Sequence, residues 1–365
     1  MDARDEAGLS VIAPVLTAVL QSLHALEFVG RHLDPEQLAD VLGTIGTPDE
    51  KLRAALTGFA PDQFSDTLAP IAQQIADAAA RTLTAFDGAR AAADAMDVRG
   101  AYRALRQEAG ALEALYPLVP VLPAVAAFFL EPAARQDADL QARLAAAAPD
   151  TGVMHAANER DMRGGFSVFV PESYRPEIAH PVVVALHGGS GHGRTFRWNW
   201  VRTARGRGLV VVCPTAMEQT WALGGSDVDG PNIARILNFV RGRWNVDPAK
   251  MLLTGMSDGA TFTLLSGLQD ASPFTHLAPF APGFHPMLVQ MSSQERLAGL
   301  PVYLVHGERD WMFPVEMARR AAEMFQAVGA RITYREVANL AHVYPRDENA
   351  ALVDWFLREP VPQVP

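Results

Sequence analysis

A serine at the centre of segment 255–259 has a spacing suited to nucleophilic catalysis. The segment reads Gly-Met-Ser-Asp-Gly, a G-x-S-x-G pattern. Residues 251–254 before it are typical of a short buried strand, and residues 260–268 after it are typical of a helix. A sharp turn from strand to helix strains the serine backbone and exposes the hydroxyl, and the flanking glycines let neighbouring backbone approach. We therefore predict that Ser257 is a nucleophile.

An acid and a base follow this serine along the chain. Asp310 lies just past an apolar strand pattern at 301–305, and His342 lies on the loop after an alternating pattern at 332–337. A serine hydroxyl is a poor nucleophile at neutral pH, so it needs a histidine base, and an aspartate can fix the tautomer of that base. The chain order serine, aspartate, histidine differs from the orders in the two common serine protease folds.

Other residues compete for these two roles. Glu308 lies close to Asp310 in the sequence, and His285 and His306 are alternatives to His342. We interpret His306 as a buried structural histidine at a strand end and His285 as a loop residue near the pocket. The remaining histidines have no metal-ligand spacing, so no metal site is expected.

The region from about residue 160 to 358 resembles the α/β-hydrolase superfamily. Within it, the region is similar to the small esterases that include phospholipase/carboxylesterase, feruloyl-esterase-like and polyhydroxybutyrate-depolymerase-like members. Four segments carry this resemblance: a glycine loop at 187–191, the serine motif at 255–259, and segments 306–314 and 342–345. The resemblance favours Asp310 over Glu308, because the spacing from Asp310 to Pro314 matches the family pattern.

An ester hydrolase also needs backbone amides that stabilise a developing oxyanion. The amide of Asp258, directly after the serine, is the first donor we expect. The second should come from the glycine loop, where the resemblance implies Gly189, with Gly188 as a further contributor. Many relatives carry a residue other than aspartate at position 258, so the backbone donor is retained while the charge near the site differs.

Aromatic residues gather beside these loops, and we predict that Trp221 and Trp311 line an apolar or aromatic substrate pocket. The alternative for each tryptophan is packing in the core. Apolar strand patterns separated by helical patterns predict a parallel sheet covered by helices, with the motif loops at the carboxyl ends of the strands.

The first 150 residues differ from the rest in amino-acid composition and in charge. They contain 11 Lys+Arg against 21 Asp+Glu, which accounts for the whole net charge of −10. Their alanine- and leucine-rich periodicity predicts several helices. We expect two domains: a helical domain at 1–150, with a boundary near 148–152, and a hydrolase domain at 151–365. For the helical domain three roles stay open, namely packing or homodimerisation, a lid formed by about 117–130, and docking to a granule or protein.

The composition also limits partners and location. An acidic chain offers no basic footprint for nucleic acid or anionic membranes. The apolar run at 116–130 is short and interrupted by three prolines, so no membrane span is expected. The acidic N-terminal residues lack a basic leader, which favours a cytoplasmic location. The single cysteine, Cys213, lies in an apolar run and is expected to be a buried small residue.

The sequence therefore predicts an α/β-hydrolase fold preceded by an all-helical domain. The function we expect is that of a serine carboxylic-ester hydrolase (EC 3.1.1 class), which acts through an acyl-enzyme on neutral or aromatic esters without metal or organic cofactor. The alternatives are a polyester depolymerase or feruloyl-type esterase for polymeric substrates, a serine peptidase, and a non-catalytic binding protein on the same scaffold.

Overall fold

The chain forms two compact units in a computed structural model that describes residues 3–146 and 148–360. The units are Met1–Phe129 and Leu130–Pro365, whereas the sequence suggested a boundary near residue 150. Glu131 illustrates the difference, because it accepts hydrogen bonds from Thr203 at 2.8 Å and from Arg207 at 3.2 Å, both in the second unit. Each unit is described by itself.

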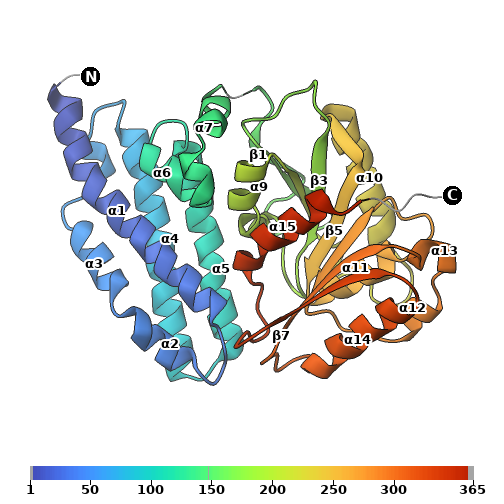
Figure 1. The fold of residues 1–365 in the computed structure, drawn as a ribbon. Helices are drawn as coiled ribbons and strands as arrows, with labels where there is room; N and C mark the ends of the chain where they lie inside the picture. The colour runs from blue at the N-terminus through green and yellow to red at the C-terminus, as the bar shows by residue number, and fades with distance from the viewer. Residues whose placement is uncertain (1–2, 147, 361–365) are drawn as a thin grey trace. The chain divides into compact units, whose positions relative to one another are not determined.

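The first unit is helical, as the sequence predicted (Figure 1). Its helices are α1 (Ala3–Arg31), α2 (Leu38–Ile45), α3 (Pro48–Ala55), α4 (Ala69–Asp94), α5 (Val98–Leu115) and α6 (Pro123–Phe128), with short 3₁₀ turns η1 (Pro61–Gln63) and η2 (Tyr116–Leu118). Small side chains let α4 and α5 approach closely, since a Cβ added at Gly88 would lie 2.8 Å from the Cβ of Ala104.

Helix α1 is unusually apolar. Its segment Asp5–Arg31 is long and apolar enough to cross a membrane by length and composition, with a mean hydropathy of 1.7. Core helices of soluble proteins meet the same criterion, and Val19, Leu23 and Leu26 of α1 are fully buried. The expectation of no membrane span rests on residues 116–130 and does not extend to α1.

The second unit contains an eight-stranded sheet of described residues in the order β1-β2-β4-β3-β5-β6-β7-β8. All neighbouring strands from β4 to β8 in this order pair in parallel, whereas β2 is antiparallel to both of its neighbours. The strands are β1 (Gly152–Ala156), β2 (Phe166–Val170), β3 (His180–Leu186), β4 (Val210–Pro214), β5 (Val246–Met256), β6 (His276–Phe280), β7 (Pro301–Gly307) and β8 (Arg331–Val337). The predicted mostly parallel sheet is confirmed, and β1 is the strand that the sequence did not indicate.

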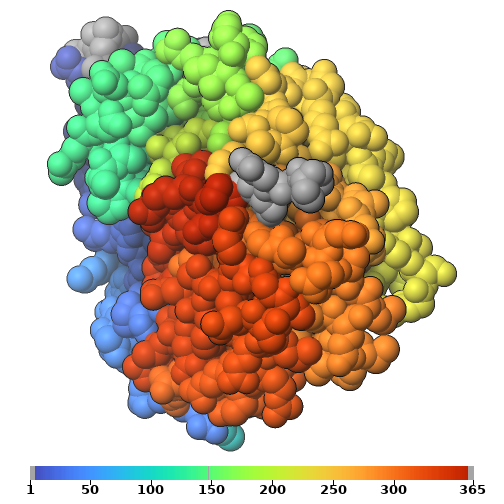
Figure 2. All heavy atoms as spheres, turned by 45° about the vertical axis from the view of Figure 1, so that its right-hand side comes forward, coloured from blue at the N-terminus to red at the C-terminus, as the bar shows by residue number. Residues whose placement is uncertain are grey.

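Helices and short turns precede, connect and follow these strands (Figure 1). They are η3 (Ala133–Gln136), α7 (Ala138–Ala145), α8 (Gly193–Phe196), η4 (Arg197–Asn199), α9 (Val201–Arg207), α10 (Asp229–Arg243), α11 (Asp258–Gly267), α12 (Met287–Gln290), α13 (Gln294–Leu297), α14 (Val315–Ala327), η5 (Arg346–Glu348) and α15 (Asn349–Arg358). In the space-filling view, the C-terminal part of the chain, coloured orange to red, forms much of the visible face of this unit (Figure 2).

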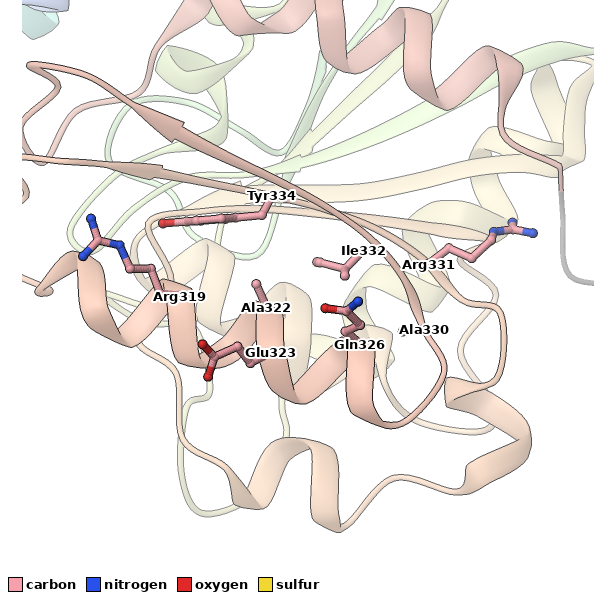
Figure 3. A pocket seen from close by; sticks show the side chains of 8 residues that line it. All are labelled: Arg319, Ala322, Glu323, Gln326, Ala330, Arg331, Ile332 and Tyr334. Carbon is pink, nitrogen blue, oxygen red and sulfur yellow. The ribbon is translucent and has the colours of Figure 1, made fainter.

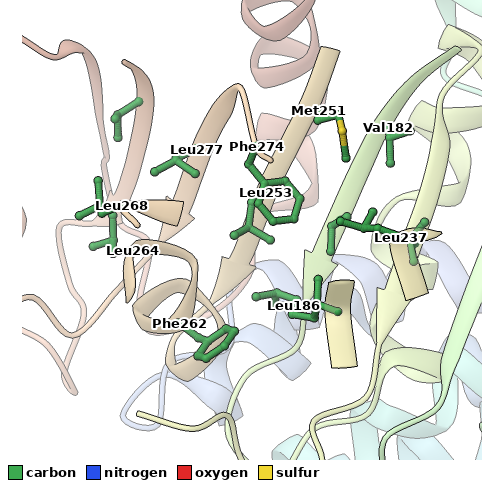
Figure 4. Packing of buried hydrophobic residues seen from close by; sticks show 14 of the residues in the cluster. Val182, Leu186, Leu237, Met251, Leu253, Phe262, Leu264, Leu268, Phe274 and Leu277 are labelled. Atoms are coloured by element: carbon green, nitrogen blue, oxygen red, sulfur yellow. The ribbon is translucent and has the colours of Figure 1, made fainter. Parts of the chain in front are cut away.

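The main core of the second unit lies between one face of the sheet and helices α10, α11 and α14 (Figure 4). Alternate strand residues such as Val182, Leu186 and Leu253 point into it, because successive side chains of a strand face opposite sides. Leu237 and Phe262 enter from α10 and α11. Helices α9 and α15 are joined by an ion pair between Arg207 and Asp354.

One lysine fastens the end of α15 to the sheet. The Lys250 amine, on β5, donates hydrogen bonds to the carbonyls of Phe356, Leu357 and Glu359 at 3.0, 3.0 and 2.7 Å. These carbonyls lie at the end of the helix, where partners within the helix are missing and positive charge is favourable. Burial lowers the pKa of Lys250.

His276 on β6 lies beside this lysine and is completely buried. Its ring packs edge-on against Phe356, with the ring centres 4.9 Å apart, and its Nε2 lies 3.3 Å from the carbonyl oxygen of Glu359. Burial, reinforced by the charge of Lys250, lowers the pKa of His276 from 6.5 to about 4. The imidazole is therefore neutral in the folded chain at neutral pH.

We expect acid to destabilise the fold partly through His276. Between a pKa of about 4 in the folded chain and about 6.5 in the unfolded chain, the unfolded state binds more protons. The free energy of unfolding should therefore fall as the pH falls through this window, with about 3 kcal/mol from this group. Urea unfolding at about pH 7 and about pH 4.5 measures the change.

The matched variants for this test are His276→Gln and His285→Gln, the second being at an exposed position. The first should reduce the loss of stability between the two pH values, and the second should not. Part of the loss should remain in both, because burial also lowers the pKa of His192 and His306. An identical pH dependence in the native chain and His276→Gln would rule out this role of His276.

Candidate active site

The turn from β5 into α11 holds Ser257 in a strained backbone conformation. Its φ of 57° and ψ of −118° lie outside the regions that a non-glycine residue favours, at a cost of about 1–3 kcal/mol. The amide of Ser257 donates to the carbonyl of Phe280 at 3.0 Å, which fixes the turn to the neighbouring strand. The predicted strand, turn and helix are all present around the serine.

The two glycines of the motif allow very close backbone contacts. A Cβ added at Gly255 would lie 2.5 Å from the carbonyl carbon of Gly259, and one at Gly259 would lie 2.4 Å from the carbonyl oxygen of His187. No side chain fits at either position without moving backbone. The motif therefore presses the start of α11 against the end of β3.

The structure brings Ser257, His342 and Asp310 into one hydrogen-bonded chain. His342 Nε2 lies 3.0 Å from Ser257 Oγ, and His342 Nδ1 lies 2.8 Å from Asp310 Oδ2. The exposed fractions are 8% for the serine, 5% for the histidine and 7% for the aspartate. These distances suit proton transfer between the serine and the imidazole, with the carboxylate orienting the ring.

Asp310 is also held by the loop that follows it. Its Oδ1 accepts hydrogen bonds from the amides of Met312 at 2.9 Å and Phe313 at 2.8 Å. Burial alone would raise the pKa of the Asp310 carboxyl, but the hydrogen bond and charge of His342, with the Phe313 amide, outweigh burial and lower this pKa. The carboxylate is therefore ionised at neutral pH and can stabilise a charged imidazole.

The competing residues lie outside this hydrogen-bonded chain. Glu308 is exposed and accepts from the amide of Asn339 at 3.3 Å. His285 is exposed on a loop. His306 is buried at the end of β7 and donates from Nε2 to the carbonyl of Phe313 at 2.8 Å, and burial lowers its pKa. His306 thus supports the loop that carries the acid.

The predicted oxyanion residues lie against the serine. A Cβ at Gly188 would lie 3.6 Å from the Cβ of Ser257, and one at Gly189 would lie 2.6 Å from Asp258 Oδ2. Within the described residues, the amides of Gly189 and Asp258 donate no hydrogen bond to the rest of the chain. Both amides are therefore available to a ligand beside Ser257.

The two tryptophans predicted to line a pocket have different surroundings. Trp311 is 48% exposed, and its ring centre lies 6.1 Å from that of His342. Trp221 is only 2% exposed and stacks on Phe262, with ring centres 5.5 Å apart. Its Nε1 donates to the carbonyl of His187 at 2.7 Å. Trp311 is accessible beside the base, whereas Trp221 supports the glycine loop from the core.

Apart from Trp221, sequence reasoning missed the contacts that the loop between β4 and α10 makes with the site. Thr220 on this loop donates to Asp258 Oδ2 at 2.5 Å. Asp227, just before α10, accepts from the amide of Gly230 at 2.8 Å, within the first turn of that helix. Asp229 behaves differently, because its buried carboxylate accepts from amides of the loop. No side-chain motif identifies the contacts of Asp229, because their donors are backbone groups.

A separate hollow of about 620 Å³ lies on the edge of the second unit, between α14 and β8 (Figure 3). It is lined by residues that include Arg319, Glu323 and Tyr334 and by none of the three hydrogen-bonded site residues. Arg319 is paired there with Glu336 at 2.6 Å. This hollow is therefore distinct from the site formed by Ser257 and its partners. In the described part of the chain, no group of three or more His, Cys, Asp or Glu side chains is arranged to hold a metal ion.

Comparison with known families places this geometry in context. Residues 236–357 match the family model described as Phospholipase/Carboxylesterase. The matched residues lie in the second unit and make up about a third of the chain. The match covers the serine, aspartate and histidine of the hydrogen-bonded chain and leaves the glycine loop outside it.

One curated relative matches part of the chain. The chain is 30% identical over 148 residues to the bifunctional acetylxylan esterase/xylanase XynS20E of Neocallimastix patriciarum. This alignment covers 39% of the chain and only 21% of that protein, so the chain spans about a fifth of its length.

Two solved structures are similar to part of this chain in overall fold, at low sequence identity. A thermostable esterase has a TM-score of 0.47 at 17% identity, covering 60% of this chain and 64% of that one. Thermogutta terrifontis esterase 2, phosphorylated by paraoxon, has a TM-score of 0.45 at 20% identity, covering 56% of this chain and 93% of that one.

We expect Gly259→Ala to destabilise the α/β-hydrolase unit by several kcal/mol, since the new methyl group would overlap backbone at the end of β3. The matched control is Gly242→Ala, in α10, where a Cβ would meet nothing within 4 Å. That change should stabilise the helix by about 0.5–1 kcal/mol. Thermal unfolding of both variants measures the contrast, and equal melting temperatures would refute the packing argument.

Proposed function

We propose that the chain is a serine carboxylic-ester hydrolase that acts through an acyl-enzyme. The observation that carries this proposal is the continuous hydrogen-bonded chain from Ser257 through His342 to Asp310, built on a strained turn. An activated hydroxyl beside two unused backbone amides suits attack on a carbonyl carbon. The match of residues 236–357 to the phospholipase/carboxylesterase family model supports the same reaction class.

Acylation would begin when Ser257 Oγ attacks the ester carbonyl carbon. His342 Nε2 takes the hydroxyl proton as the new C–O bond forms, and Asp310 stabilises the resulting imidazolium. The carbonyl oxygen becomes an oxyanion, for which the amides of Gly189 and Asp258 are the donors we propose. Collapse of this intermediate breaks the bond to the alcohol, which leaves with the proton held by His342.

Deacylation would repeat these steps with water as the nucleophile. His342 removes a proton from the water as its oxygen attacks the acyl carbon. The bond between the acyl carbon and Ser257 Oγ then breaks, and His342 returns the proton to that oxygen. The products are a carboxylic acid and the regenerated enzyme. No step requires a group beyond the side chains and amides of this site.

The substrates we propose are neutral esters, including aryl esters. Trp311 and Met312, which are 48% and 45% exposed, supply apolar surface next to the acid and base. A depolymerase or feruloyl-type activity on a polymer is the second candidate, because the exposed Trp311 offers a flat face and the curated relative is described as an acetylxylan esterase. Peptide hydrolysis would use the same groups.

The first test is hydrolysis of p-nitrophenyl esters from acetate to long acyl chains, beside a feruloyl ester and acetylated xylan. Ser257→Ala should abolish turnover, because the acyl-enzyme can no longer form. Asp310→Asn should lower kcat by about 10³- to 10⁴-fold, because the imidazole loses its orienting carboxylate. Retained activity in folded Ser257→Ala would overturn the assignment, and inactivity of the folded native chain on every ester would favour a peptidase or binding role.

A second expectation concerns the charge of Asp258 next to the site. At about 8 Å and an effective dielectric constant of about 40, a like charge costs about 1 kcal/mol, or about fivefold in rate. Asp258→Asn should therefore raise kcat/KM for p-nitrophenyl hemisuccinate relative to p-nitrophenyl butyrate by about fivefold. The asparagine oxygen can still accept from Thr220, so the substitution tests charge rather than packing. An unchanged ratio would show that this carboxylate does not select against anionic substrates.

A further inference from the structure

The loop Met217–Ala222, between β4 and α10, contacts every segment that bears a proposed oxyanion donor. We propose that Asp229 is a positioning residue that clamps this loop and thereby fixes the oxyanion amides. The inference rests on the proposed ester-hydrolase function. It concerns side chains that belong neither to the hydrogen-bonded chain nor to the glycine loop.

Asp229 joins the two ends of the loop through one carboxylate. Its Oδ1 accepts from the amide of Met217 at 2.8 Å, and its Oδ2 accepts from the amide of Ala222 at 2.8 Å. The side chain sits in the first turn of α10, and the residue is 1% exposed. Because the two oxygens hold the loop at both ends, the four residues between them are constrained as a unit.

Each of three consecutive loop residues then contacts a different part of the oxyanion region. The carbonyl of Gln219 accepts from the amide of Ser190 at 3.0 Å, next to Gly189. Thr220 donates to the Asp258 carboxylate at 2.5 Å, and Trp221 donates to the carbonyl of His187 at 2.7 Å.

These contacts reach both segments that would supply oxyanion donors. One is the glycine loop after β3, and the other is the start of α11. Donors must sit within a few tenths of an ångström of their best positions to stabilise a transition state fully. A clamp on the β4–α10 loop therefore acts on catalysis without touching the substrate.

The buried surroundings of Asp229 indicate that its carboxylate is there to bind the two loop amides. Burial raises the pKa of its carboxyl, and the two amides only partly offset this effect. A buried carboxylate is costly unless its hydrogen bonds are satisfied, and a nearby surface residue would cap the helix equally well. Asp227 already accepts from the amides of Asp229 and Gly230, so the start of α10 does not need the Asp229 carboxylate.

The test compares Asp229→Asn with Asp227→Asn. Both remove one negative charge from the same turn at nearly constant shape, but only the first breaks the clamp, since an amide NH₂ cannot accept from the second loop amide. For p-nitrophenyl acetate, Asp229→Asn should lower kcat about tenfold or more with KM changed less than about twofold. Asp227→Asn should keep both values, because asparagine also caps helices.

Two further variants keep the inference testable should Asp229→Asn fail to fold. Trp221→Phe keeps the ring stacking and removes the indole donor to His187, while Thr220→Val removes the hydroxyl donor to Asp258. Both should lower kcat rather than raise KM, whereas a tryptophan that binds substrate would raise KM. Circular dichroism confirms folding of each variant.

The outcomes separate the inference from the proposed function. A kcat loss in Asp229→Asn, or in the two loop variants, with native values in Asp227→Asn supports the clamp. Native kcat in folded Asp229→Asn, or in both loop variants where Asp229→Asn does not fold, overturns it while leaving the hydrolase assignment intact. A native chain without esterase activity defeats the proposed function, and the clamp falls with it.

Discussion

The second unit depends on one constraint, the close approach of backbone at the turn between β5 and α11. The turn is possible only because Gly255 and Gly259 have no side chains where the end of β3 lies against the start of α11. Its energetic cost is concentrated in Ser257, and the hydrogen bond to Phe280 and the packing of α11 hold it in place. The histidine, the acid and the glycine loop can act together with Ser257 only because this turn places the serine beside them.

The mostly parallel sheet brings the other groups to the same place. Strands β3, β5 and β7 run in the same direction, so the glycine loop, Ser257 and Asp310 all follow their carboxyl ends. The loop after the edge strand β8 brings His342 to them. The reactive groups come from distant parts of the chain, yet each is placed by a short local connection to a rigid strand. For this reason the three side chains are almost completely buried, although they lie on short loops at the edge of the sheet.

The parts of this site that the sequence predicts are those with local signatures. Ser257 was predictable because its motif, strand and helix are consecutive, and the order of Asp310 and His342 follows from the topology. Strand β1 was missed because its five residues include a histidine and a glycine and lack a clear alternation. The clamp by Asp229 was missed because its partners are backbone amides, which no side-chain pattern identifies. Burial of Trp221 was unpredictable for a related reason, since loop and core tryptophans have the same sequence signature.

The anchoring of α15 by Lys250 has a practical consequence for handling the protein. The chain contains only two lysines, Lys51 and Lys250. The amine of Lys250 is engaged with three carbonyls, whereas Lys51 is exposed on α3. Amine-reactive dyes and resins should therefore couple first at Lys51, on the helical unit, because the amine of Lys250 must give up three hydrogen bonds before it can react. Partial labelling through lysine thus directs attachment away from the end of α15.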